Sequence, residues 1–204
     1  MKNHMTILLS LLIAALTKPT NGNAQDFLTV TEKTDFRRTS TYAETVDFYQ
    51  RLEKASPYGK LIVFGQTSQR RDLHCFIVSK DKAFTPEAAA KTGKVIMLVQ
   101  NGIHAGEIDG KDAGMMLLRD IAFGSQRHLV DHVNLVFVPI FNVDGHERSG
   151  PFNRPNQRGP NNQGWRNTAQ NLNLNRDYVK ADAPEMRAML GYYRFPWFYR
   201  RMAR

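Results

Sequence analysis

A histidine and a glutamate three residues apart are the clearest candidates for chemistry in this chain. His104 and Glu107 follow an apolar run directly, and Gly102 and Gly106 relax the backbone around them. An imidazole nitrogen and a carboxylate oxygen at this spacing can converge on one Zn²⁺ ion. Ligands of open α/β sheets gather at the carboxyl ends of strands, which suits this position. The two residues are therefore candidate metal ligands, although H-x-x-E taken alone is more typical of a solvated glutamate beside an incidental histidine.

Two arginines further along the chain could handle negative charge. Arg166 follows a tryptophan in a polar stretch, and Arg176 follows Asn175. A guanidinium can hold a carboxylate through two parallel hydrogen bonds, and it can stabilise an oxyanion that develops during a reaction. Arg166 is thus a candidate catalytic residue, and Asn175 with Arg176 is a candidate substrate-binding pair. Taken singly, each arginine is more typical of an ordinary surface position.

The elements that must position these residues follow from hydrophobic patterning. Helical spacing predicts helices over Tyr42–Ala55, Pro86–Lys91, 109–122 and 184–190. Two runs at 60–66 and 73–79 predict a β-hairpin, and the unbroken apolar runs at 95–99 and 133–138 are typical of strands covered on both faces. Helices that alternate with buried strands predict an α/β fold with a mixed, largely parallel central sheet. The polar segment 150–175 predicts a long functional loop.

Several other polar residues have structural interpretations. The segment 142–145 predicts a tight turn, since Asn, Asp and Gly tolerate such backbone angles. We expect His74 to face outward, and His128 and His132 to be solvent-exposed. His146 is a weak candidate because it follows the turn, and Cys75, the single cysteine, is expected to be a buried thiol.

The beginning of the chain has the pattern of a secretory signal. Lys2 precedes an apolar core at 7–16, and small residues lead to Ala24. This core is about half of the ~20 apolar residues that cross a bilayer, which argues against a membrane anchor. We expect residues 1–24 to be removed, and the mature chain to be exported to the periplasm or the medium without membrane association.

The net charge of +9 does not indicate a nucleic-acid partner. Six of the 28 basic residues lie in the expected signal or in the last eleven residues, which leaves 22 basic against 19 acidic residues. So mild a charge excess does not predict a nucleic-acid groove.

Four motifs in one order give these candidates a family context. They are HAGE at 104–107, PIFNVDG at 139–145, GWRNT at 164–168 and NLNLNRD at 171–177. Together they resemble the zinc carboxypeptidases of the carboxypeptidase A type over roughly residues 42–190. The resemblance implies that residues 25–190 are the N-terminal part of such a catalytic domain, which acts on peptide or protein C-termini with Zn²⁺.

The same resemblance implies a role for each candidate. His104 and Glu107 match the first two zinc ligands, and Arg166 matches the arginine that stabilises the oxyanion. Asn175 and Arg176 match the pair that binds the terminal carboxylate of the substrate.

The chain departs from the family pattern at two places. The resemblance implies a third ligand, a histidine, followed by a general-base glutamate and a substrate-side tyrosine, and residues 191–204 instead form a basic aromatic tail. We interpret this tail as aberrant sequence, the domain as incomplete on its C-terminal side, and the chain as having little or no activity. Asn173 stands where the family often has an aspartate, and its amide adds no negative charge to a zinc-bound imidazole.

Two other functions stay open at this point. A zinc amidohydrolase or deacylase could share the fold and the first ligand motif. A non-catalytic secreted module could keep the grip on peptide C-termini without chemistry. An incomplete sheet would also leave apolar edges that favour aggregation.

Overall fold

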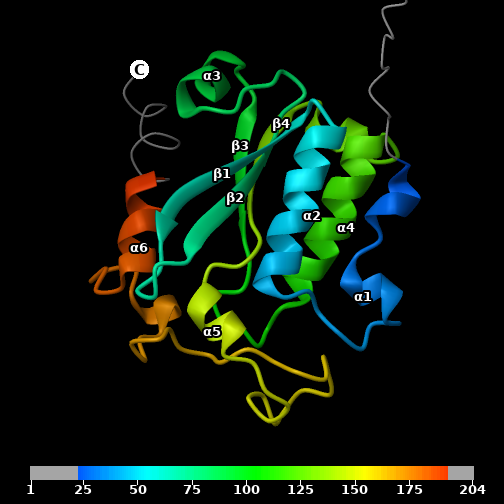
Figure 1. Cartoon of the computed structure of the whole chain (residues 1–204). Coiled ribbons are helices and arrows are strands. Elements are labelled where there is room, and N and C mark those ends of the chain that lie inside the picture. The colour runs from blue at the N-terminus through cyan, green and yellow to red at the C-terminus, as the bar shows by residue number, and fades with distance from the viewer. Residues whose placement is uncertain (1–22, 193–204) are drawn as a thin grey trace, which may run out of the picture.

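A four-stranded sheet flanked by helices forms the centre of the computed structural model, which describes residues 23–192 (Figure 1). The strands are β1 (Gly59–Gln66), β2 (Asp72–Val78), β3 (Val95–Gln100) and β4 (Val133–Val138). The helices are α1 (Val30–Lys33), α2 (Tyr42–Ala55), α3 (Pro86–Lys91), α4 (Asp109–Phe123), α5 (Val143–Glu147) and α6 (Pro184–Met189), with 3₁₀ turns η1 (Ala24–Phe27), η2 (Arg127–Val130) and η3 (Leu174–Arg176). The α/β class is confirmed. The expected signal up to residue 22, and the tail from 193 on, lie outside the described residues.

The sheet is mixed, in the order β1-β2-β4-β3. β1 and β2 form the predicted hairpin, β2 pairs with β4 antiparallel, and β3 pairs with β4 parallel over six residue pairs. The expected predominance of parallel pairing is therefore wrong for these four strands. An unbroken apolar run predicts burial on both faces, and it carries no information about the direction of the neighbouring strand. The predicted burial is confirmed for β4 and is wrong for β3, whose Val95 and Met97 are 54% and 48% exposed.

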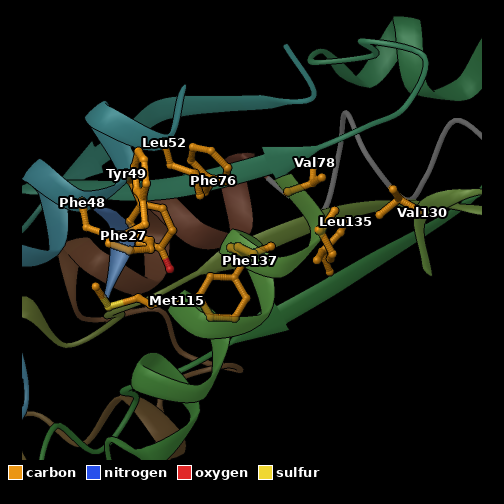
Figure 2. Close-up of a cluster of buried hydrophobic side chains, with 12 residues drawn as sticks. Phe27, Phe48, Tyr49, Leu52, Phe76, Val78, Met115, Val130, Leu135 and Phe137 are labelled. Carbon is orange, nitrogen blue, oxygen red and sulfur yellow. The ribbon is translucent and has the colours of Figure 1, made fainter. Parts of the chain in front are cut away.

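Adjacent residues of the inner strands face two different cores, which explains the absence of alternation. In β4, Leu135 and Phe137 belong to the core beneath α2 and α4, while Val136 and Val138 belong to the core beneath α3 and α6. Each buried side chain of this size contributes about 1.5–3 kcal/mol. Figure 2 shows the first core, where Tyr49 of α2 lies beside the strand phenylalanines.

Local signals set several boundaries. The predicted capping box of α2 is present: Glu44 N–H donates to Thr41 Oγ1 at 3.2 Å, and Thr41 N–H donates to Glu44 Oε2 at 2.8 Å. The predicted tight turn at 142–145 is instead the start of α5, because Asn142 Oδ1 accepts from Gly145 N–H at 3.0 Å and caps the helix.

The other histidines and the cysteine have defined surroundings. His128 and His132 are exposed and Cys75 is buried, as expected. His74 does not face outward, because Tyr42 of α2 packs over it with its hydroxyl 3.3 Å from His74 Nδ1. Within residues 23–192, the helices are all too short or too polar to cross a membrane.

Candidate metal site

The turn between β3 and α4 places His104 opposite Glu107. His104 is buried, while the Glu107 side chain is 44% exposed. His104 Nδ1 lies 3.4 Å from Oε2 and 3.4 Å from Oε1 of the carboxylate. Two ligand atoms on one tetrahedral ion with bonds of roughly 2.1 Å are themselves about 3.4 Å apart. The spacing therefore fits two ligands of a single Zn²⁺ ion.

The other nitrogen of His104 is held by Asn173, the N-cap residue of η3. Asn173 Oδ1 accepts the backbone N–H of Asn175 at 3.1 Å, which fixes the amide oxygen toward the site. His104 Nε2 lies 3.3 Å from the same oxygen. Nε2 must then carry the ring proton, and Nδ1 presents its lone pair toward Glu107, as a metal ligand requires.

Two glycines let the long polar loop lie directly on this turn. A Cβ on Gly106 would meet Arg154 Cγ at 2.4 Å and the Gly164 carbonyl oxygen at 2.8 Å. A Cβ on Gly164 would meet the Ala105 carbonyl oxygen at 2.5 Å. Such close approach of two backbones tolerates no side chain at either position.

Arg166 reaches the site from the part of the loop that is tied to α5. Asn142 Nδ2 donates to the Arg166 carbonyl oxygen at 3.0 Å, and Trp165 N–H donates to the Gly145 carbonyl oxygen at 2.7 Å. From this base, Arg166 Nη1 lies 3.4 Å from Glu107 Oε1. The structure thus brings together three of the five predicted site residues.

A second arginine, which sequence reasoning missed, is closer to the same carboxylate. Arg154 Nη2 lies 2.7 Å from Glu107 Oε1. Burial acts to raise the pKa of Glu107, but the hydrogen bond and charge of Arg154, with those of His104, leave the pKa below its usual value. Arg154 lies outside the four motifs, nine residues after the second and ten before the third, and only the unusual length of its loop could have drawn attention to it.

Comparison with known families bears on this arrangement. Residues 45–190 match the family described as zinc carboxypeptidase.

The chain belongs to the zinc carboxypeptidase family.

Solved carboxypeptidase structures share its fold. A metallo-carboxypeptidase from Burkholderia cenocepacia is 19% identical with a TM-score of 0.53, over 74% of this chain and 36% of that one. Carboxypeptidase A from Helicoverpa armigera is 16% identical with a TM-score of 0.56, over 74% and 41%. Bovine thrombin-activatable fibrinolysis inhibitor, solved with a tick carboxypeptidase inhibitor, is 16% identical with a TM-score of 0.59, over 78% and 56%. At these identities the likeness establishes the fold alone.

The similarity covers most of this chain but only part of each solved structure. This chain spans only 36–56% of the lengths of these zinc carboxypeptidase structures. No curated protein sequence matches it. Within the part of the chain that the structure describes, no three His, Cys, Asp or Glu side chains come together as a metal site. Within the described residues, His104 and Glu107 are therefore a candidate ligand pair with no third such side chain beside them.

The remaining pair predicted by the carboxypeptidase resemblance lies on η3. Asn175 and Arg176 are both exposed, and Asn175 reaches the site through its backbone N–H to Asn173. Arg176 Nη1 donates to the Asn175 carbonyl oxygen at 2.9 Å. The rest of this guanidinium is open to a ligand that arrives from solvent.

His146, the weak candidate, belongs to a separate buried cluster. Its Nε2 lies 3.4 Å from Lys111 Nζ, and its Nδ1 lies 2.8 Å from Glu147 Oε1. Burial lowers the pKa of His146, against the raising effect of Glu147, and burial also lowers the pKa of Lys111 to about 8. Because both ring nitrogens have partners, His146 is not placed to bind a metal with His104.

Proposed function

We propose that the chain is the metal-binding part of an exported zinc carboxypeptidase that removes C-terminal residues from peptides. The observation that carries this proposal is the geometry of His104, whose Nδ1 faces both oxygens of Glu107 at 3.4 Å while Asn173 holds Nε2. A solvated glutamate beside an incidental histidine would not need the ring to be oriented from its far side. Membership of the zinc carboxypeptidase family supports the same metal and reaction class.

The chain's own residues supply distinct functions in this scheme. Zinc, when bound by His104 and Glu107, would polarise the scissile carbonyl group and activate water. Arg166 points at this place, where a cationic donor to the developing oxyanion is worth about 3 kcal/mol of barrier. Asn175 and Arg176 would hold the terminal carboxylate, which distinguishes the end of a peptide from an internal bond.

We also propose that this chain alone turns over little or no peptide. Catalytic zinc sites of this type use three protein ligands, and the described residues bring together two. Weak zinc binding follows from that shortfall. Asn175 and Arg176, which would hold the substrate terminus, are present, and we expect the chain to bind peptides even without catalysis.

The first test measures zinc binding. The whole chain, His104→Ala and Glu107→Ala are titrated with zinc chloride against a chelator of known affinity, with His128→Ala as the control because that histidine is exposed. We expect weak binding that is lost in the first two variants and kept in the control. Zinc binding unaffected by either substitution would refute the proposed site. Tight stoichiometric binding would point to a third protein ligand and would overturn the proposal of inactivity.

The second test separates the possible functions. Peptides with free C-termini, the same peptides as C-terminal amides, and N-acylated amino acids are offered with zinc. We expect binding of free C-termini that needs Arg176, with little turnover. Binding without any turnover, even when the site is fully loaded with zinc, would favour a non-catalytic module. Turnover of acylated amino acids in place of peptides would favour an amidohydrolase.

Export can be tested directly. If residues 1–24 are a signal, the mature protein recovered from outside the cytoplasm begins near Gln25. Full-length protein retained in the cytoplasm would contradict this.

A further inference from the structure

Arg154 lies in a hydrogen-bonded loop that packs against the turn carrying His104 and Glu107. The loop that carries it is closed at its ends, where Gly150 and Gln163 exchange backbone hydrogen bonds at 2.9 and 3.0 Å. The neighbouring Asn153 Nδ2 donates to the carbonyl oxygens of Arg148 at 2.8 Å and Gln163 at 2.9 Å. Arg154 therefore projects from a loop whose own conformation is fixed.

The contact between Arg154 and Glu107 is the tightest that the carboxylate makes. Arg154 Nη2 lies 2.7 Å from Oε1, against 3.4 Å for Arg166 and 3.4 Å for His104. The Arg154 side chain is only 14% exposed, while that of Glu107 is 44% exposed. A glutamate as open as this would otherwise lose its fixed orientation to rotamer freedom.

The contact leaves the ligating positions of Glu107 available. A carboxylate offers about four lone-pair sites on two oxygens. Arg154 and Arg166 both approach Oε1, while Oε1 and Oε2 alike lie 3.4 Å from His104 Nδ1. One oxygen is thus anchored while the other is presented to the metal position.

We propose that Arg154 is a positioning residue that holds Glu107 opposite His104 before the metal arrives. The role in zinc binding rests on the proposed function, and the role in orienting Glu107 does not. A guanidinium repels a dication, but the carboxylate lies between them, and removal of hydrogen-bond partners of metal ligands typically costs 10–100-fold in affinity. The orienting effect is therefore expected to outweigh the repulsion.

The first measurement compares zinc affinity in variants of the whole chain. Arg154→Met keeps the apolar stem and removes the charge, Arg154→Lys restores a single donor, and Arg158→Met is a matched control in the same loop with an exposed side chain. We expect about a tenfold loss for Arg154→Met, partial recovery for Arg154→Lys, and no change for Arg158→Met. Equal or tighter zinc binding by Arg154→Met would overturn the proposal.

The second measurement needs no metal and so separates this proposal from the proposed function. Three-bond NMR couplings of Glu107 in the zinc-free chain report whether its side chain keeps one rotamer. We expect one rotamer in the parent chain and in Arg158→Met, and averaging over several in Arg154→Met. A single rotamer that persists without Arg154 contradicts the positioning role, whatever the zinc affinities are. Failure of the parent chain to bind zinc would refute the proposed metal site and leave this readout intact.

Discussion

At the scale of single residues, Asn173 is the hydrogen-bond partner of His104, the proposed metal ligand, and substitutions of Asn173 should change the zinc affinity. Its oxygen accepts from both His104 Nε2 and Asn175 N–H, and a carboxylate in its place would keep both bonds and add negative charge. We expect Asn173→Asp to bind zinc more tightly and Asn173→Ala to bind it about 10–100-fold more weakly.

The comparison needs a control in the same segment. Gln170→Ala is suitable, because Gln170 is exposed in the same loop. Competition with a chelator gives all four affinities. An affinity of Asn173→Asp no higher than that of the parent chain would show that charge at this position has no influence on the metal.

His146 predicts a pH dependence of stability. Burial holds its pKa below the unfolded value, in a cluster where Lys111, Asp112 and Glu147 face it. A depressed folded pKa means that the stability present above the unfolded pKa of about 6.5 is lost as the pH falls toward the folded value.

Urea unfolding at pH 7.5 and pH 5.5 measures this loss. We expect the parent chain to lose more stability between the two than His146→Gln does. His74, whose pKa is also lowered by burial, contributes a loss of the same sign in both proteins. An equal loss in the two proteins would mean that His146 takes up its proton as readily in the folded state.

At the scale of elements, the carboxylate of Asp144 joins α5 to the β1–β2 hairpin. Its side chain is fully buried and accepts from Thr67 Oγ1 at 2.9 Å, from Gln69 N–H at 3.2 Å and from Arg71 Nη1 at 2.7 Å. The position of α5 matters to the site, because α5 and its cap hold the segment that carries Arg166.

We expect Asp144→Ala to destabilise the fold by about 3–5 kcal/mol, since it leaves buried donors and a charged partner without their acceptor. Asp47→Ala is the control: its ion pair with Arg51 lies on the surface of α2 and should contribute at most about 1 kcal/mol. Chemical denaturation gives both values. Similar small effects for the two substitutions would show that solvent can replace Asp144 as the acceptor for the hydrogen-bond donors of the β1–β2 hairpin.

At the scale of the whole molecule, the outer edge of β3 is an exposed apolar edge of the described sheet. β3 is the last strand of the described sheet, and its Val95 and Met97 are 54% and 48% exposed. An apolar strand edge is a template for pairing with another chain.

A single lysine on this edge should reduce self-association. We expect Met97→Lys to increase the monomer fraction measured by light scattering. Leu129→Lys adds the same charge at an exposed apolar residue on η2, outside the sheet, and serves as the control. An equal effect of both variants would indicate that net charge, and not the edge, controls association.

The sequence by itself determined the features that depend on neighbours along the chain. The apolar run of β4 predicted burial on both faces because successive residues of a strand point in opposite directions. The capping box at Thr41 and Glu44, and the spacing of His104 and Glu107 on one turn, are likewise local. These contacts need only a few residues of chain, and residue type and spacing are enough to predict them.

Only the tertiary structure decided the contacts between distant segments. Three features depend on which surfaces pack together. They are the antiparallel pairing of β2 with β4, the burial of His146, and the contacts of Asp144 with the β1–β2 hairpin. Arg154 lies 47 positions from Glu107 in the sequence, and a polar loop gives no periodicity that could place its guanidinium. Local patterns thus specified the candidate ligand pair, while packing supplied the groups that contact it.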